Sequence, residues 1–284
     1  MLASDHYSIY KTAVQEVLHD SERLPSLPNI TMKIRQEISK DSATAESIAH
    51  LVNKDPSLSA LLIKSASSPL FRRPVAPKTL VDVIGLLGFN QVNNLVMLHS
   101  VRSLYAIHNS KSKKLFNLTW KRLIVKTSVA MFLAKKLYYH PLDQVPMATL
   151  LTEVGSLSVL SVTLETAEIP DENTYIDLCR HYSKSLGTIL LTKWKVDPVF
   201  IEINRQSGKW GQDSGEELEL IDIVNLAIYN TVLLTNKNPN LPQLQTLAAY
   251  QKLPLPLQSL KSPFHLTFVY EHKEEIQEII NSFV

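Results

Sequence analysis

The sequence predicts an all-α protein, and three observations support this prediction. The chain of 284 residues contains only seven glycines, while strong helix formers such as Leu, Lys and Glu are plentiful. Apolar residues recur at helical spacing, as in Ile30, Ile34 and Ile38. Asp-Pro pairs at 55–56 and 197–198 are typical helix starts, since proline fits the first helical position. Together these patterns indicate about a dozen helices.

Composition limits the class of protein. Hydrophobic residues make up 45% of the chain and charged residues 20%, with a net charge of +2. We therefore expect a soluble globular protein, and this charge does not by itself imply nucleic-acid binding. The single Cys179 excludes an internal disulfide and a cysteine-based zinc site, which favours the reducing cytoplasm. No signal peptide and no uninterrupted apolar run of about 18–20 residues is expected.

Start signals define the helices of the first half. Leu24-Pro25-Ser26-Leu27-Pro28 interrupts one helix, and Pro28 can begin the next. Asp55 precedes Pro56 as a helix cap, and Thr79-Leu80-Val81-Asp82 resembles a capping box that leads to Gly88. The expected helices of this half are 9–18, 30–38, one beginning at 44, 55–66, 79–87 and 90–106.

The second half is expected to contain longer helices. The polar and basic residues 109–114 are the expected hinge between the halves. Residues 236–263 carry five prolines and are expected to be partly irregular. The expected helices of this half are 116–138, 147–164, 174–195, one beginning at 198, 218–234 and 265–283.

Several segments, in order and spacing, resemble one family, the HDOD domain (the HD-related output domain of bacterial signalling proteins). The resemblance covers about residues 24–207. The segments that carry it are Leu24-Pro25-Ser26-Leu27-Pro28, 55–62, 83–89, Trp120-Lys121-Arg122, the octet Leu150-Leu151-Thr152-Glu153-Val154-Gly155-Ser156-Leu157, and 186–194.

The resemblance implies a multi-helical HDOD fold with two helical subdomains, the second of which is like an HD phosphohydrolase. On this basis residues 1–110 form the N-terminal helical subdomain and 111–235 the HD-like one. Residues 236–284 supply the Pro-rich segment and a C-terminal helix that packs on the HD-like part.

The resemblance also locates the metal-ligand positions of HD hydrolases, which need imidazoles and carboxylates around a cation that acidifies water. In this chain only Glu153 among them could still bind a cation, and Arg122 places a positive charge where the metal would lie. We therefore expect no metal, no other cofactor and no enzymatic activity. The positions are Arg122, Thr152, Glu153, Ser183 and Ile228, with a further one near Gln206-Ser207.

Arg122 and Glu153 could instead form an ion pair that replaces the metal–carboxylate contact, because Arg offers planar paired donors to a carboxylate. The alternative is that both side chains point to solvent.

Two further groups of residues are open to more than one interpretation. Cys179 beside Arg180-His181 could be a reactive thiol, although a packed helical cysteine is the simpler interpretation. Basic loop residues could contact phosphates or could be solvated surface charge. The candidate contact residues are Arg72, Arg73, Lys78, Lys113 and Lys114, with Lys111 and Lys121 nearby.

The resemblance implies a regulatory, non-catalytic module that acts through protein–protein contacts in bacterial signal transduction. Its expected partners are other signalling proteins, such as receiver or cyclic di-GMP-related proteins. We expect no contact with a membrane and do not favour nucleic acid as a partner. The docking surface could be a groove between the halves or the Pro-rich segment 239–263. The competing hypothesis is a degenerate metal-dependent phosphohydrolase acting on a nucleotide or cyclic dinucleotide. Metal content and phosphodiesterase activity distinguish the two.

Overall fold

A computed structural model describes residues 2–20, 24, 26–67, 77–104, 110–166, 169–211, 215–235 and 240–283. The chain forms two compact units. The larger comprises Met1–Pro25 with Ile107–Gln277, and the smaller comprises Ser26–Ala106 with Glu278–Val284.

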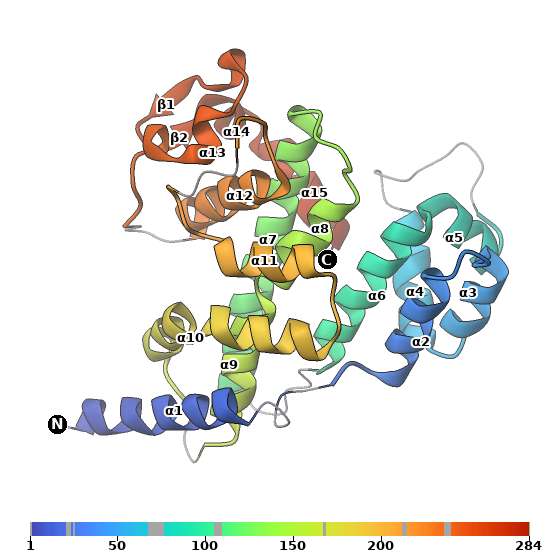
Figure 1. The fold of residues 1–284 in the computed structure, drawn as a ribbon, viewed down its shortest axis with the longest axis horizontal. Helices are drawn as coiled ribbons and strands as arrows, with labels where there is room; N and C mark the ends of the chain where they lie inside the picture. Colours follow the sequence, from blue (N-terminus) through green and yellow to red (C-terminus); the bar gives the residue numbers. More distant parts are fainter. Residues whose placement is uncertain are drawn as a thin grey trace. The chain divides into compact units, whose positions relative to one another are not determined.

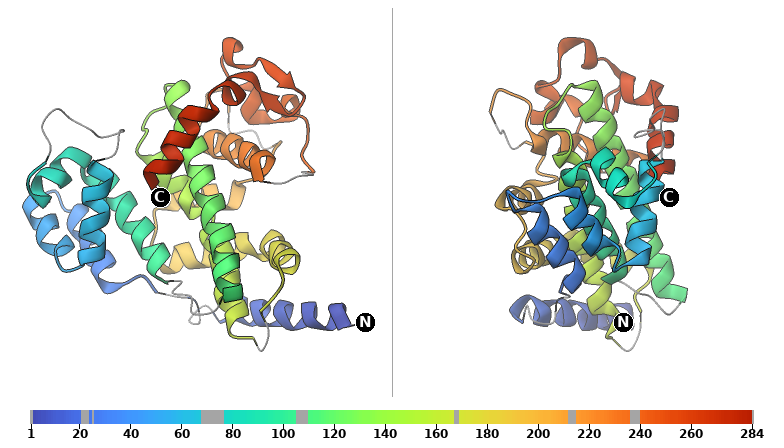
Figure 2. Two further views of the ribbon diagram at one scale, coloured as in Figure 1. Left: turned by 180° about the vertical axis from the view of Figure 1, so that it is seen from behind. Right: turned by 90° about the vertical axis from the view of Figure 1, so that its right-hand side faces the viewer.

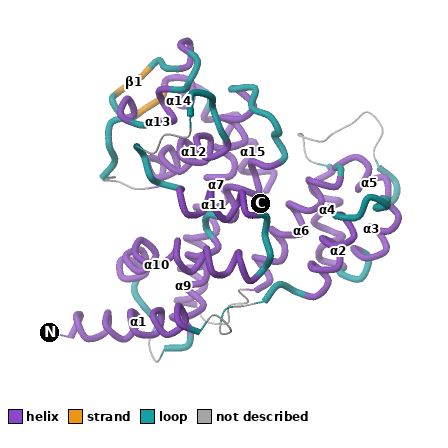
Figure 3. Tube along the Cα trace, in the orientation of Figure 1, coloured by secondary structure: helices purple, strands orange, loops and turns teal. Residues whose placement is uncertain are grey.

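Helices dominate both units, which confirms the all-α prediction (Figure 3). In the described part of the chain, extended structure is confined to a short antiparallel hairpin. It is formed by β1 (Leu260–Ser262) and β2 (His265–Leu266).

Five helices of the smaller unit lie between residues 29 and 104, and in three of them a side chain caps the N-terminus (Figure 1). The side chains of Thr44, Asp55 and Thr79 each accept a hydrogen bond from the third residue of the helix that follows. Gly88, at φ +75°, allows a bend of 106° between the last two helices. The helices are α2 (Asn29–Ile38), α3 (Ala45–Val52), α4 (Pro56–Ala66), α5 (Leu80–Leu87) and α6 (Phe89–Leu104).

In the larger unit, the long helix α7 packs against α8, α9 and α12, and α9 packs along α10 (Figures 1 and 2). The core contains large apolar side chains, among them fully buried Phe132 and Tyr175. The helices are α7 (Ser110–Lys136), α8 (Gln144–Leu151), α9 (Val154–Leu164), α10 (Glu172–Lys193), α11 (Pro198–Gln206) and α12 (Leu220–Thr235).

The first helix, α1 (Leu2–His19), belongs to the larger unit and not to a subdomain of residues 1–110. It packs on α9 and α10 and buries Tyr10, Val14 and Val17. The long helix of this unit, α7, begins at Ser110. Residues 110–114, expected in the hinge, are therefore helical, while 105–109 lie outside the described residues.

The C-terminal segment is more broken than the single helix expected over 265–283. His272 leaves the helical conformation, at φ −106° and ψ 31°, and separates two helices. Phe268 stacks on Phe132 of α7 with ring centres 6.1 Å apart, and Lys252 forms a buried ion pair with Asp222 of α12 at 3.1 Å. The elements are η2 (Leu244–Thr246), α13 (Ala248–Gln251), η3 (Leu255–Leu257), β1, β2, α14 (Thr267–Glu271) and α15 (Lys273–Phe283).

Among the described residues, the segment Gln144–Leu164 is long and apolar enough on average to span a membrane. It comprises α8 and α9, and 83% of its most apolar stretch is buried inside the fold. Burial of this kind is typical of a core helix.

Candidate functional site at the junction of helices α8 and α9

The chain turns at Thr152-Glu153, where the sequence predicted one continuous helix over 147–164. α8 ends at Leu151 and α9 begins at Val154. The backbone stays close to helical, but its hydrogen bonds here join residues three apart instead of four. The Glu153 N–H, for example, donates to the Leu150 carbonyl at 3.1 Å. This tighter turn is the reason for the break, and it places the Thr152 and Glu153 side chains at a junction between two helices.

Gly155 lets α9 approach α10 very closely. A Cβ atom on Gly155 would lie 1.7 Å from the Ser183 carbonyl oxygen, so only glycine fits. Gly187 in turn lies against Asn204 of α11, whose side-chain oxygen would be 3.1 Å from an added Cβ. These contacts hold α9, α10 and α11 together beside the Thr152-Glu153 turn.

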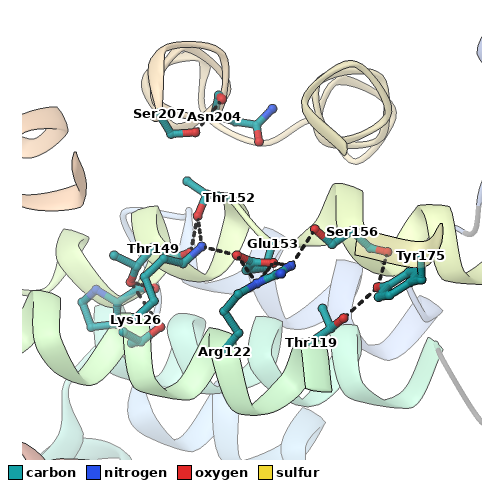
Figure 4. Close-up of polar contacts among 12 residues, drawn as sticks. Thr119, Arg122, Lys126, Thr149, Thr152, Glu153, Ser156, Tyr175, Asn204 and Ser207 are labelled. Atoms are coloured by element: carbon teal, nitrogen blue, oxygen red, sulfur yellow. Dashed lines mark hydrogen bonds and ion pairs between the residues drawn. The ribbon is translucent and has the colours of Figure 1, made fainter. Parts of the chain in front are cut away.

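Glu153 forms a paired ion contact with Arg122, which the sequence raised as a hypothesis (Figure 4). Arg122 donates from Nη2 to Oε2 at 2.7 Å and from Nε to Oε1 at 3.2 Å. The same guanidinium donates to the Ser156 hydroxyl at 3.1 Å. The pair is largely removed from solvent, with 25% of the Arg122 side chain and 10% of the Glu153 side chain exposed.

Lys126 adds a second cation to this pair and was not singled out from the sequence. It lies one helical turn after Arg122 on α7 and donates to Glu153 Oε1 at 2.9 Å. It also donates to the Thr152 hydroxyl, which itself donates to the Thr149 carbonyl at 2.7 Å. Four-residue spacing from Arg122 was the available signal, because positions i and i+4 share a helix face.

Hydroxyl groups extend the network away from the ion pair. The Tyr175 hydroxyl donates to the Ser156 carbonyl at 2.9 Å and lies 2.7 Å from the Thr119 hydroxyl. Cys179 is buried beside them, with its sulfur 3.9 Å from the same carbonyl. Burial raises the pKa of the Cys179 thiol to about 11, which favours a packed cysteine over a reactive one.

Charge proximity sets the protonation states of the cluster. Burial opposes ionisation of Glu153, but the cations Arg122 and Lys126 outweigh it and lower the pKa of this carboxyl to about 2. Burial also opposes the charge on Arg122, and Glu153 reverses this and raises the Arg122 pKa. For Lys126 burial dominates, so its pKa is lowered although Glu153 attracts the ammonium.

The residues present do not fit a divalent cation. Both carboxylate oxygens of Glu153 accept hydrogen bonds from Arg122, and Oε1 also accepts one from Lys126. A cation bound there would face an ammonium and a guanidinium at hydrogen-bond distance from its ligand. Among the residues that the structure describes, no group of three or more His, Cys, Asp or Glu side chains could hold a metal.

Among the described contacts, none of the remaining positions that the resemblance located shares a hydrogen bond with this cluster. Ser183 is half-buried on α10, where its backbone contacts Gly155. Ile228 is half-buried on α12. Ser207 is buried and donates to the Asn204 carbonyl at 2.9 Å. Asn204, which the sequence analysis did not identify, donates to the Lys184 carbonyl and the Thr188 hydroxyl at 3.1 Å.

The expected basic contact residues occupy separate segments. Arg72 and Arg73 lie outside the described residues. Lys78 is exposed just before α5, and its backbone N–H bonds to Asp82 at 3.0 Å. The other two, Lys113 and Lys114, are exposed in the first turns of α7, where Lys114 pairs with Glu172 at 3.3 Å.

The fold defines a class of protein: a multi-helical one whose second half is like an HD phosphohydrolase and contains a buried ion cluster. A family model for the HDOD domain matches residues 24–209. The chain belongs to the HDOD family, as the sequence motifs predicted.

Solved structures share this fold. A proposed metal-dependent phosphohydrolase from Shewanella amazonensis SB2B superposes with a TM-score of 0.78 at 20% identity, covering 99% of this chain and 100% of that one. An HDOD domain protein from Geobacter sulfurreducens gives 0.65 at 16% identity, covering 96% of each. A proposed signal transduction protein from Marinobacter aquaeolei VT8 gives 0.62 at 16%, covering 98% of this chain and 66% of that one. No curated protein matches significantly.

Proposed function

We propose that this HDOD protein is a non-catalytic regulatory module that works by contacting other cytoplasmic signalling proteins. One observation carries the proposal. At the positions where the family resemblance locates a His-Asp metal pair, the single carboxylate Glu153 is bonded to Arg122 and Lys126. Hydrolysis of this type requires a metal that acidifies water, and the side chains at this site provide cations in place of ligands.

The structural relatives support the signalling half of the proposal. One is named as a proposed signal transduction protein and another as an HDOD domain protein. Others are named as proposed phosphohydrolases, so catalysis must be tested directly.

Activity and metal content test the non-catalytic part. The full chain is incubated with bis(p-nitrophenyl) phosphate and with cyclic di-GMP, in the presence of added Mg²⁺, Mn²⁺ or Fe²⁺. We expect rates equal to those of the same mixtures without protein, and less than stoichiometric metal by elemental analysis. Turnover by the unaltered chain that depends on the added metal would overturn the proposal.

Affinity capture from the native bacterium tests the contact part. Leu255 lies in η3 of the Pro-rich segment named from the sequence, and its side chain is 82% exposed. We expect the full chain to retain defined signalling proteins and Leu255→Ser to retain less of them. Tyr138→Ser, at an 86% exposed position outside that segment, serves as the matched control. Equal retention by both variants would argue against this segment as the docking surface.

A further inference from the structure

A histidine–aspartate pair joins two helices of the smaller unit. His99 of α6 lies with its Nε2 atom 3.2 Å from Oδ2 of Asp55, the residue that caps α4. Both side chains are partly exposed, at 21% for His99 and 24% for Asp55. The ion cluster belongs to the larger unit, so this pair is a separate polar site of the chain.

His99 uses its ring differently from other histidines on or next to helices of this chain. His19, His181 and His272 each donate from Nδ1 to the carbonyl oxygen four residues earlier, at 2.7–2.8 Å. In the described part of the chain, Nδ1 of His99 has no hydrogen-bond partner. It is also not one of the buried polar atoms that lack a partner there. The Nδ1 atom of His99 is therefore open to solvent.

Asp55 determines which nitrogen of the ring carries the hydrogen. Its Oδ1 accepts from the Leu58 N–H at 3.0 Å, so the start of α4 holds the carboxylate in place. Burial opposes ionisation of Asp55, but the Leu58 N–H and His99 outweigh it and lower the pKa of this carboxyl. An ionised carboxylate can only accept, so Nε2 of the neutral ring carries the hydrogen and Nδ1 carries the lone pair. An imidazole nitrogen presented in this way is a nucleophile.

We propose that His99 is a phosphoryl-acceptor site whose donor is an acyl phosphate. Nδ1 attacks phosphorus, the bond between phosphorus and the acyl oxygen breaks, and a carboxylate leaves with the bonding electrons. The ring keeps its Nε2–H and becomes cationic, so no proton has to be removed. Asp55 lies at hydrogen-bond distance to stabilise this cation, as the aspartate of a Ser-His-Asp triad stabilises its imidazolium.

The surroundings of His99 favour this use of the imidazole over two others. A metal ion would need further ligands, and among the described residues no group of three or more His, Cys, Asp or Glu side chains could hold one. A serine hydrolase would need a hydroxyl bonded to the ring, and no described hydroxyl is bonded to Nδ1. Phosphoryl transfer depends mainly on position and charge, and Arg102, exposed three residues later on the same face of α6, adds a cation.

Acetyl phosphate is the probe. The full chain is incubated with it, and the intact mass, the position of added phosphate by tandem mass spectrometry and the phosphorus NMR spectrum are measured. We expect up to one phosphate per chain, on Nδ1 of His99, stable in alkali and lost in acid as is usual for a phosphorus–nitrogen bond. The test needs no partner protein, so its outcome is independent of the proposed protein contacts.

Three variants test the roles of the two residues. His99→Gln should take up no phosphate, and the matched control is His50→Gln, because His50 is exposed on α3 of the same unit. Asp55→Asn keeps an oxygen that can cap α4. It should slow uptake about tenfold or more, because the cationic ring loses its charged partner. Part of the phosphate should then appear on Nε2, a change of nitrogen that a purely structural role of Asp55 would not cause.

The unaltered chain alone can overturn the inference. It fails if acetyl phosphate adds no phosphate, or if the phosphate lies on a residue other than His99. An adduct that alkali removes would be an acyl phosphate on a carboxylate and would equally exclude the imidazole. Equal uptake by His99→Gln and His50→Gln, both with the circular dichroism spectrum of the unaltered chain, would also exclude it.

Discussion

Glu153 is the residue on which the buried cluster depends, because two cations share its carboxylate. Removing Glu153 should therefore destabilise the protein more than removing either of its cations. Loss of the carboxylate leaves two positive charges together, whereas loss of one cation leaves a neutral pair. This asymmetry can be measured in single variants.

Glu153→Gln keeps the shape of the side chain and removes its charge. We expect the free energy of unfolding to fall by about 3–5 kcal/mol, because Arg122 and Lys126 lose their shared counter-ion. Urea unfolding followed by circular dichroism gives the value. The control is Glu172→Gln, which removes a surface pair with Lys114 and should cost less than about 1 kcal/mol. Equal losses would contradict the central role of Glu153.

Lys126→Met should behave differently from Glu153→Gln. Methionine fills similar space, and Glu153 keeps its paired contact with Arg122. Since burial already disfavours the charged form of Lys126, we expect the free energy of unfolding to change by less than about 1.5 kcal/mol or to rise. The same urea experiment measures it. A loss as large as that of Glu153→Gln would show that Lys126, and not Arg122, is the main partner.

The cluster also predicts a pH dependence. The Glu153 pKa of about 2 lies below its ordinary value of 4.5, so the folded state favours the carboxylate. Its stabilisation is fully present above the unfolded value and is lost as the pH falls toward 2. The difference in unfolding free energy between the unaltered chain and Glu153→Gln should therefore shrink between about pH 5 and pH 2. A difference that stays constant over this range would exclude the ion pair.

At the scale of elements, Gly155 sets how closely α9 and α10 pack. Gly155→Ala would drive a methyl group into the Ser183 backbone, and we expect a loss of at least about 3 kcal/mol. Gly85→Ala is the control, because an added Cβ in α5 meets nothing within 4 Å and removes backbone freedom, which stabilises by about 0.5–1 kcal/mol. The thermal unfolding temperature should therefore fall for Gly155→Ala and rise for Gly85→Ala.

Local signals predicted most helices, whereas tertiary contacts decided the rest. Asp55 and Thr79 cap their helices as expected, since capping depends on a few neighbouring residues. The break at Thr152-Glu153 was not predicted, because the cations that bind Glu153, Arg122 and Lys126, lie on a different helix, α7. The hairpin at 260–266 was not predicted either, and it packs against α14.

The candidate site was predicted in part for the same reason. The spacing of the family motifs identified Arg122 and Glu153 as site positions, and in the structure the two form an ion pair. Lys126 was overlooked because a lysine in an amphipathic helix ordinarily lies on the solvent face. Its burial depends on Thr152 and Glu153, which lie 26 and 27 residues further along the chain.

At the scale of the whole molecule, the family match ends before the larger unit does. α12 follows residue 209 and buries Val224, Leu226 and Tyr229 completely, packed on α7 and α8. A chain ending at residue 211 should therefore lose cooperative thermal unfolding, while one ending at 277 should keep it. Near-ultraviolet circular dichroism measures the transition. Cooperative unfolding of the shorter chain would show that α12 is dispensable.

The paired contact between Arg122 and Glu153 also constrains evolutionary history. Reintroducing His and Asp at positions 152 and 153 alone would not recreate a hydrolase, since Arg122 and Lys126 would still repel the incoming ion. Replacing Arg122 or Lys126 one at a time would pass through forms with unbalanced interior charge. Several substitutions together would therefore be needed before this cluster could hold a metal ion.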